Sequence, residues 1–512
     1  MIRLSLVTSV IGYLCLGFVL LMVVPLVTAC ILQQPDSIFA FSVCIVASVA
    51  LGRLAMRADK DANFDNMNRM ESMAVVCFGW CVLALLGAIP YMYFGLSFVD
   101  SFFESMSGFT TTGSTILTDF SIFNSSMFFY RSYTQWIGGL GILVIFVALL
   151  PQLAIAGRQL FFAEVSAESK DQLSPRIKDT AGQLLAWYVI LTLLCVAGLC
   201  RTGMNLTDAF SNSFSTLAAG GFSPNGESIM GYHNPGAEWV IIIFMFLAGA
   251  NFVLQVKSYN IFVDYLNSYS RKEANKSLRK KYSFFDSIKC FFGNTELIAY
   301  AVIVLLAVLF ISIALCRAYP GMQLTEIIRQ AFFQCLSIIT TTGSASIDYD
   351  KVWVMSAKAI LVVLMFIGGC SGSAGGGMKV VRIVILLKYF WKVLLKSIYP
   401  EAVIRMKFDN RMLRESDVQP VLTFFMFYLM LFFIGGAVLS FIENSVVVGF
   451  SGSIACLGNI GPGFEAIGPM GSFGGFHGIS KIICAILMWA GRLEVMALVV
   501  FMRPEVWRGS RW

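Results

Sequence analysis

Four short segments of this chain share one register, in which a phenylalanine precedes a glycine by eleven residues. The four glycines are Gly113, Gly221, Gly343 and Gly461. Glycine adopts backbone dihedrals that other residues rarely reach, and its missing side chain lets carbonyl oxygens crowd an ion. Rings of backbone carbonyls that replace a hydration shell are the chemistry of cation-selective filters. The four segments therefore predict a site where four similar stretches of backbone hold a dehydrated cation.

The elements that must position these glycines are short helices. Each glycine follows an apolar run that is too short to cross a bilayer and lies between two runs that are long enough. A half-helix directs the partial negative charge of its C-terminal end toward the turn, which favours a cation. Asp100 and Asp208, thirteen residues before their glycines, are the predicted N-caps. A single re-entrant loop could simply fill space, whereas four in common register indicate a pore with pseudo-fourfold symmetry.

The composition indicates a membrane protein. Of 512 residues, 57% are hydrophobic and 13% are charged, against roughly 25% charged residues in soluble domains. We expect an all-α polytopic membrane protein, in which a two-helix hairpin precedes four pseudo-symmetric helix–re-entrant loop–helix repeats around a central pore. The expected units are the hairpin 1–60 and the repeats 70–157, 180–257, 294–395 and 417–504. The ten expected spans are 4–32, 37–56, 73–96, 131–154, 182–200, 237–256, 296–316, 357–390, 419–441 and 478–502.

Lysine and arginine predict the orientation of the spans. They gather after every second span, which places those loops in the cytoplasm by the positive-inside rule. Both termini and the loops 258–290 and 391–417 are then cytoplasmic, whereas 97–130 and 442–477 are external. The basic stretch 258–290 is either an ordinary solvated loop or a docking surface for anionic membrane lipid or a cytosolic partner. The net charge of +7 is localised in such loops, so it indicates topology and no nucleic-acid partner.

A second glycine-rich segment lies within the second span of the third repeat. Six of the ten residues from 368 to 377 are glycine, and each glycine destabilises a helix by roughly 1 kcal/mol relative to alanine. We expect an unwound intramembrane loop that blocks the pore on the cytoplasmic side of the filter. The alternative, close helix packing through small residues, suffices for the shorter small-residue pairs of the other repeats. The predicted gate residues are Gly369, Gly372, Gly375, Gly376, Gly377, Lys379 and Arg492.

Arg492 stands midway along the last predicted span. A charge at that depth is costly and marks a functional site by default. Arg492 is either a structural group paired with carbonyls of the glycine-rich segment or an electrostatic barrier in the ion path, and the two roles are compatible. Glu494, two positions later, does not share its helix face.

No pattern in the sequence indicates an enzyme. The spans carry no combination of nucleophile, base and acid, no phosphate loop, and no metal-ligand spacing among the thirteen cysteines. We therefore expect no catalytic residues and no covalently bound cofactor. Asp119, Glu227 and Glu465 lie near the expected external mouth, where they either concentrate cations or belong to plain solvated loops.

The four glycine segments resemble the filter segments of a known family. They read TTTGS from Thr110, AGGF from Ala219, TTGS from Thr341 and NIGPG from Asn459. Together they resemble the Trk/Ktr/HKT potassium transporter superfamily, and most closely its bacterial TrkH-type membrane subunits. The resemblance covers about 70–502, and the first two spans match the extra hairpin of that subfamily. It implies that potassium is bound by backbone at Thr111, Thr112, Gly113, Ala219, Gly220, Gly221, Thr341, Thr342, Gly343, Asn459, Ile460 and Gly461.

The resemblance also implies a function and partners. Glycine at the first filter position, where some relatives carry serine, is the family's potassium-permissive pattern. Ala218 and Ala219 depart from it, because relatives often carry a hydroxyl residue there. The family moves potassium, its substrate, across the bacterial cytoplasmic (inner) membrane through a channel-like pore with an intramembrane gate. It acts as a homodimer with one pore in each protomer, regulated by a cytosolic ring of nucleotide-binding, RCK-type subunits.

One alternative function stays open at this point. The chain could be a proton- or sodium-coupled potassium symporter with alternating access. Such carriers usually contain inverted repeats and broken helices, whereas the four repeats here run in parallel, which favours a pore. The sequence does not distinguish passive from coupled transport, and it does not identify the regulatory nucleotide, the sodium permeation or the rate.

Overall fold

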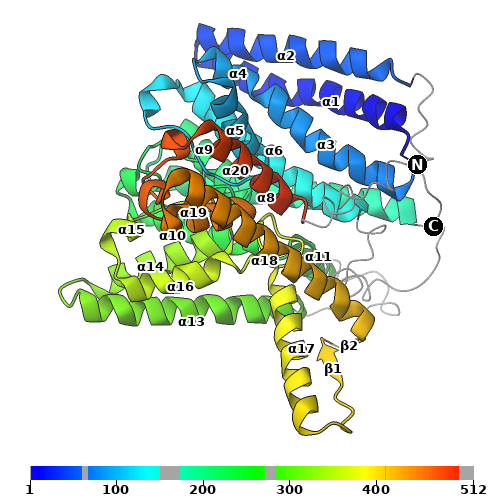
Figure 1. Cartoon of the computed structure of the whole chain (residues 1–512), viewed down its shortest axis with the longest axis vertical. Helices are drawn as coiled ribbons and strands as arrows, with labels where there is room; N and C mark the ends of the chain where they lie inside the picture. The colour runs from blue at the N-terminus through cyan, green and yellow to red at the C-terminus, as the bar shows by residue number, and fades with distance from the viewer. Residues whose placement is uncertain (1, 60–66, 150–172, 271–283, 410, 495–512) are drawn as a thin grey trace.

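The fold is described from a computed structural model over residues 2–59, 67–149, 173–270, 284–409 and 411–494. Its regular structure is helical apart from one antiparallel hairpin of β1 (Met406–Phe408) and β2 (Arg411–Leu413). Two leading helices, α1 (Leu4–Ile31) and α2 (Pro35–Met56), pack against each other along their length (Figure 1). Four groups of helices follow them in the chain.

Each group contains a long helix, a short buried helix and a further helix. The first contains α3 (Arg69–Gly87), α4 (Ile89–Tyr93), α5 (Phe98–Phe109) and α6 (Ser125–Leu149). The second contains α8 (Leu173–Arg201), α9 (Leu206–Leu217) and α10 (Pro235–Gly249), and is followed by α11 (Phe252–Ser270) and α12 (Phe284–Phe292). The third contains α13 (Thr295–Ala318), α14 (Leu324–Ile339), α15 (Tyr349–Val352), α16 (Met355–Met365) and α17 (Val380–Ile398). The fourth contains α18 (Glu415–Glu443), α19 (Val446–Leu457) and α20 (Gly478–Arg492).

The long helices identify a multi-pass membrane protein. Among the described residues, six helices are long and apolar enough to cross a membrane, and the bent pair α10–α11 would make a seventh. Their outer faces carry exposed large apolar side chains, such as Leu20 on α1 and Leu305 on α13. In water such faces would be unfavourable, whereas lipid tails solvate them.

Two predicted spans are not continuous helices. The span 237–256 is sharply bent, because α10 ends at Gly249 and α11 leaves it at 101°. The span 357–390 is interrupted at its glycine-rich segment, as expected, because no helix lies between Met365 at the end of α16 and Val380 at the start of α17. The ends of the spans 131–154 and 478–502 fall outside the described residues.

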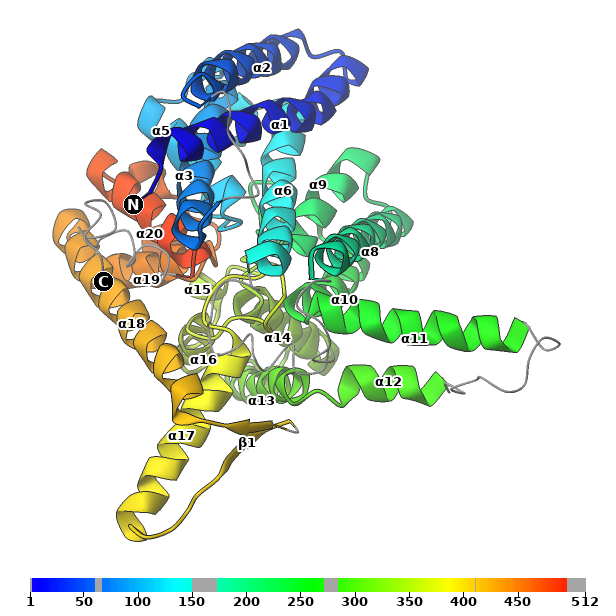
Figure 2. The ribbon, with the colours of Figure 1, turned by 90° about the vertical axis from the view of Figure 1, so that its right-hand side faces the viewer.

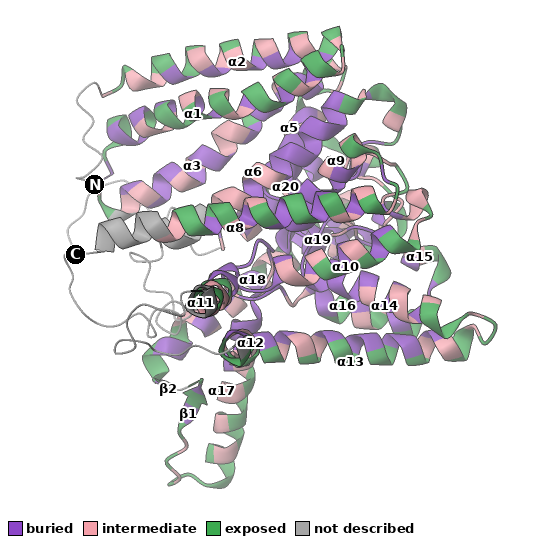
Figure 3. Ribbon diagram, turned by 180° about the vertical axis from the view of Figure 1, so that it is seen from behind, coloured by how far each residue is buried: buried purple, intermediate pink, exposed green. Residues whose placement is uncertain are grey.

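The four groups succeed one another around a common centre (Figure 2). At three of the four junctions, the last helix of one group packs against the short helix of the next: α6 against α9, α10 against α14, and α20 against α5. The last of these contacts joins the fourth group back to the first. Figure 3 shows the consequence for burial, because the short helices are largely buried while α1, α2 and α13 remain widely exposed.

The short helices α5 and α9 begin three residues earlier than predicted. Asp100 and Asp208 are not the N-caps of α5 and α9, since Ser97 and Asn205 occupy those positions. The Ser97 hydroxyl accepts the Asp100 amide at 3.2 Å, and the Asn205 side chain accepts the Asp208 amide at 2.8 Å. Each aspartate therefore stands in the first turn, where its negative charge is favourable. Asp100 also pairs at 2.6 Å with Lys481 of α20, which ties the first group to the fourth.

Candidate functional site

The four short helices α5, α9, α14 and α19 end in four turns that have the same backbone conformation. In each, the second residue after the helix is left-handed although it is not glycine, with φ of 52° at Thr111, 56° at Ala219, 59° at Thr341 and 54° at Asn459. The next amide then donates to the carbonyl five residues back, at 2.9 Å in the first turn and 2.8 Å in the others. This is the Schellman arrangement of a helix C-terminus. Its acceptors are the recurring small residues Ser107, Ser215, Ser337 and Ala455.

The glycines that follow these turns close a ring. All four have positive φ, of 84°, 76°, 74° and 102° in chain order. A Cβ on Gly113 would lie 2.1 Å from the carbonyl oxygen of Gly220, and one on Gly221 would lie 2.0 Å from that of Thr342. A Cβ on Gly343 would lie 2.0 Å from the Ile460 oxygen, and one on Gly461 would lie 2.8 Å from the Thr112 oxygen.

Each glycine thus abuts the carbonyl of the residue before the next glycine, in chain order and back to the start. We call residues 110–113, 218–221, 340–343 and 458–461 the glycine turns. The structure brings together all twelve residues that the sequence analysis assigned to the filter. A side chain at any of the four glycines would strike the backbone of a neighbouring turn, which explains why glycine stands there.

The hydroxyl and amide side chains of the glycine turns bond to one another. The Thr110 and Thr112 hydroxyls lie 2.7 Å apart, and the equivalent Thr340 and Thr342 hydroxyls lie 2.8 Å apart. In the fourth turn, the Asn459 amide donates to the Thr112 hydroxyl at 3.0 Å. It also donates to the Met488 carbonyl of α20 at 2.9 Å. These bonds fix the turns without using the glycines.

The second turn, which lacks these polar side chains, receives one from α6. Gln135 donates from Nε2 to the Gly220 carbonyl at 2.6 Å, and its Oε1 accepts from the Phe222 amide at 3.1 Å. The alanines at 218 and 219 were recognised from the sequence, whereas Gln135 was not predicted. The available signal was an amide side chain inside the predicted span 131–154, because a buried group of this kind requires partners.

A buried ion pair, also missed, holds the segments that leave the first two turns. Glu104 of α5 and Arg131 of α6, which are 0% and 2% exposed, pair at 2.5 Å. Glu104 accepts from the Ile116 amide at 2.9 Å. Arg131 donates to the Ser223 carbonyl at 3.3 Å, and its guanidinium lies 3.5 Å from the centre of the Phe222 ring. The extra hydrogen bonds are what a buried pair requires to offset its lost hydration.

The glycine-rich loop, residues 366–379, connects α16 to α17 and is closed on itself. The Gly368 amide donates to the Met378 carbonyl at 2.6 Å, and the Val380 amide donates to the Gly369 carbonyl at 3.1 Å. Its backbone therefore makes hydrogen bonds without forming a helix. Irregular backbone is tolerated at membrane depth only when it is paired within the protein or lines a water-filled cavity.

The tip of the glycine-rich loop lies directly against the glycine turns. A Cβ on Gly375 would lie 2.7 Å from the Thr340 carbonyl oxygen, and the Gly376 amide donates to the Thr341 hydroxyl at 2.7 Å. A Cβ on Gly376 would lie 2.7 Å from the Gly458 carbonyl oxygen. The loop thus touches the C-terminal ends of both α14 and α19, where only glycine leaves enough room.

Two buried, positively charged side chains donate hydrogen bonds to carbonyls of this loop. Arg492, which is 3% exposed, donates to the Ala374 carbonyl at 2.9 Å and to the Gly138 carbonyl at 3.0 Å. Lys379 donates to the Gly375 carbonyl at 2.5 Å. Glu494 does not pair with Arg492 and forms an ion pair with Arg382 of α17. Two positive charges therefore lie beside the turns, on the side of the loop.

The three carboxylates expected at the external mouth have different surroundings. Asp119 caps a short turn, and hydrogen bonds from the Ser121 amide and hydroxyl, both at 2.8 Å, lower the pKa of its carboxyl. The Glu465 carboxylate accepts from the Ser445 hydroxyl at 3.1 Å. Glu227 is exposed. Within the described residues, no group of three or more His, Cys, Asp or Glu side chains is arranged to hold a metal ion.

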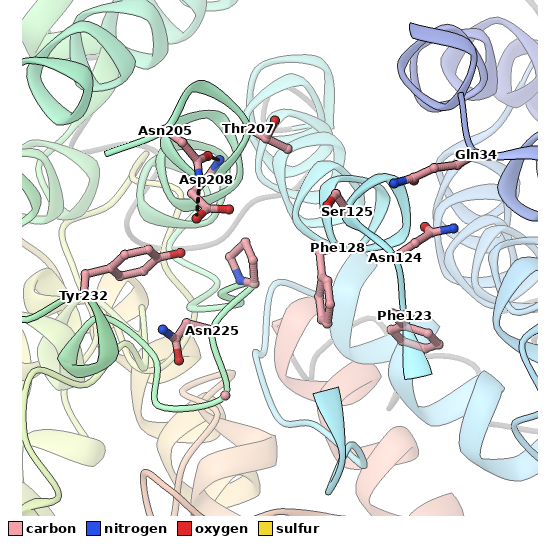
Figure 4. Close-up of a pocket in the computed structure, with 12 residues that line it drawn as sticks. Gln34, Phe123, Asn124, Ser125, Phe128, Asn205, Thr207, Asp208, Asn225 and Tyr232 are labelled. Atoms are coloured by element: carbon pink, nitrogen blue, oxygen red, sulfur yellow. Dashed lines mark hydrogen bonds between the residues drawn. The ribbon is translucent and has the colours of Figure 1, made fainter. Parts of the chain in front are cut away.

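An open pocket of about 620 Å³ lies apart from the glycine turns (Figure 4). It is lined by residues from the α1–α2 turn, the start of α6, the start of α9 and the segment 224–226, and by Tyr232. Asn205 donates to Asp208 at 2.9 Å at its edge. None of the predicted filter or gate residues lines this pocket, so it does not alter the assignment of the site.

Known proteins of one family are similar to this chain over almost its whole length. Residues 37–508 match the TrkH family model, which describes a cation transport protein. The chain is 32% identical over 510 residues to the Trk system potassium uptake protein TrkH of Escherichia coli K12, covering 98% of this chain and 99% of that one. It is 31% identical over 509 residues to TrkG of the same strain, covering 98% of each.

A solved structure has the same fold. The crystal structure of the potassium transporter TrkH from Vibrio parahaemolyticus superposes with a TM-score of 0.85 and 28% sequence identity, covering 99% of this chain and 100% of that one. The family is a family of transport proteins and not of enzymes, in agreement with the sequence analysis. The chain belongs to the TrkH family of cation transport proteins.

Proposed function

We propose that the protein mediates potassium uptake as the membrane subunit of a Trk system, through a channel-like pore. The ring of glycine turns is the observation that carries this proposal, because four helix C-termini and four left-handed turns converge on one another. Backbone carbonyls of the twelve turn residues replace the hydration shell of potassium. The partial negative charges of α5, α9, α14 and α19 favour the cation at the same place.

The glycine-rich loop is the proposed gate. It lies against the turns of α14 and α19, so an ion leaving the ring on that side meets it first. Arg492 and Lys379 hold the loop through its carbonyls and add positive charge to the ion path. Conduction then requires the loop to move, with Gly369, Gly372, Gly375, Gly376 and Gly377 supplying the conformational freedom.

The topology and assembly belong to the same proposal. The units 1–60, 70–157, 180–257, 294–395 and 417–504 form the hairpin and four pseudo-symmetric repeats. The chain resides in a bacterial inner membrane with both termini in the cytoplasm. It forms a homodimer, regulated by a cytosolic ring of nucleotide-binding, RCK-type subunits. The part of α17 from Leu387 onward supports contact with another chain or with lipid, because it exposes apolar side chains that include Leu387, Phe390, Trp391 and Ile398.

A proton- or sodium-coupled symporter is the alternative, and one experiment separates the two. The purified protein in liposomes would be tested for potassium and sodium flux while an internal dye follows pH, with protein-free liposomes as the control. A pore gives potassium flux that follows the potassium gradient alone, without a proton or sodium flux. A fixed ratio of proton or sodium flux to potassium flux would replace the pore with a symporter.

A further inference from the structure

We propose that Glu296, in the first turn of α13, is the positioning residue that holds the glycine-rich loop in place. This inference rests on the proposed function, because it concerns the loop assigned there as the gate. The side chain is 3% exposed. Its Oε1 accepts from the Ser371 amide at 2.7 Å and from the Val381 amide at 3.1 Å. One carboxylate oxygen therefore joins the middle of the loop to the helix that follows it.

The two hydrogen bonds to Glu296 are of a kind that can hold the loop against the start of α17. Val381 is the second residue of α17, and its amide is among those that have no partner within the helix. The N-cap residue of α17, Lys379, makes no side-chain capping bond. The carboxylate of Glu296 satisfies the amide from another helix, and negative charge is favoured at a helix N-terminus. Hydrogen bonds to an ionised acceptor are stronger than those between neutral groups.

Comparison with two other helices shows how Glu296 differs from a first-turn acid that caps its own helix, a role that Asn294 fills in α13. The helices α3 and α18 also carry a buried acid in the first turn, at the third position. There Glu71 accepts from the Asn68 amide at 2.9 Å while it also pairs with Arg3 at 2.8 Å, and Asp417 accepts from the Arg414 amide at 3.0 Å, so each bonds to its own N-cap residue. Glu296 stands at the second position of α13. It reaches the glycine-rich loop instead.

A second contact supports the loop from the neighbouring hairpin. The amide of Phe252, the first residue of α11, donates to the Gly372 carbonyl at 3.1 Å. The Ser258 and Ser287 hydroxyls, 2.9 Å apart, join α11 to α12, which leads into α13. Figure 2 shows α11 and α12 side by side. Gly372 is thus held by the start of α11, and Ser371 by the start of α13, which follows α12. A displacement of α11, α12 or α17 is therefore transmitted to the loop.

The test uses a thiol that the loop already contains. Cys370 is 1% exposed, so a membrane-impermeant thiol reagent should label it only when the loop moves. Full-length protein in liposomes would be labelled, and modification at Cys370 would be followed by peptide mass spectrometry, together with potassium flux and the potassium-to-sodium permeability ratio. We expect Glu296→Ala to raise the labelling rate at least tenfold and to raise flux without the regulatory ring. The permeability ratio should stay unchanged.

Two matched variants keep the test specific. Glu71→Ala removes a buried first-turn carboxylate that does not touch the loop, and should leave Cys370 protected. Glu296→Gln retains an amide oxygen that accepts the same hydrogen bonds, so it should fall between wild type and Glu296→Ala, and it serves if the alanine variant does not fold.

The outcomes separate this inference from the proposed function. If Cys370 becomes labelled while flux is unchanged, Glu296 positions the loop but the loop is not the gate. If Cys370 stays protected in both Glu296 variants while Arg492→Ala raises flux, the gate stands and the role of Glu296 is overturned. If Cys370 is labelled in Glu71→Ala as fast as in Glu296→Ala, the labelling reports a general loss of stability, and the role of Glu296 is again overturned.

Discussion

Replacing Gly113 by serine should strongly weaken the preference for potassium over sodium. Gly113 has a φ of 84°, and a Cβ there would lie 2.1 Å from the Gly220 carbonyl oxygen. An acceptable contact requires the two turns to separate by about 1 Å, whereas a binding site must be held within about 0.5 Å of its productive geometry. Gly220 cannot yield freely, because Gln135 holds its carbonyl at 2.6 Å.

The expected magnitude follows from that displacement. We expect the potassium-to-sodium permeability ratio to fall at least tenfold, which corresponds to about 1.4 kcal/mol of lost discrimination. Gly343→Ser should behave alike, because its Cβ would lie 2.0 Å from the Ile460 oxygen. Gly461→Ser should be milder, because the corresponding distance to the Thr112 oxygen is 2.8 Å.

The assay is the reversal potential of the reconstituted protein under opposed potassium and sodium gradients. Gly203→Ser is the matched control, since Gly203 has a φ of 93° but no atom within 4 Å of its added Cβ. It carries the same left-handed strain of about 1–2 kcal/mol without touching the ring, so the ratio should not change. An unchanged ratio in Gly113→Ser and Gly343→Ser, or an equal loss in Gly203→Ser, would refute the assignment of the filter.

Three further outcomes are expected. Arg492→Ala, or removal of Gly372 to Gly376, should raise potassium flux in the absence of the regulatory ring without changing the permeability ratio; folded variants with wild-type flux would place the gate elsewhere. A cysteine introduced at Glu401 should be labelled only from the cytoplasm, and one introduced at Glu227 only from outside. The reverse labelling pattern would invert the proposed orientation. Gln135→Leu should lower the free energy of unfolding by about 1–3 kcal/mol, because the Gly220 carbonyl and the Phe222 amide lose their partner, as measured by thermal unfolding in detergent; an unshifted transition would contradict the bracing role.

Local sequence was enough to predict the parts of the site that depend on local backbone physics. Length and hydropathy located the helices, because a membrane span needs a minimum number of apolar residues. The common register located the four turns, because a Schellman ending fixes the spacing between the last helical carbonyls and the glycine. Six glycines in ten residues located the break between α16 and α17, since glycine disfavours the helix.

Local patterns failed where a competing local choice existed. The capping residues of α5 and α9 were misassigned, because aspartate is favourable both at the N-cap and in the first turn. The bend after α10 was missed, because the apolar run continues through Ala250 while the backbone turns to hydrogen-bond with the loop. Hydropathy reports burial and does not report direction.

Only the tertiary structure decided which backbone faces which. The ring closes through contacts such as Gly461 with Thr112, and the loop is held by Glu296 and Arg492, which lie far from it in sequence. The importance of Gln135 also depends on a carbonyl 85 residues away. A polar side chain in an apolar span indicates that it needs a hydrogen-bond partner. The identity of that partner depends on how whole helices pack around the ring, and no local pattern encodes that arrangement.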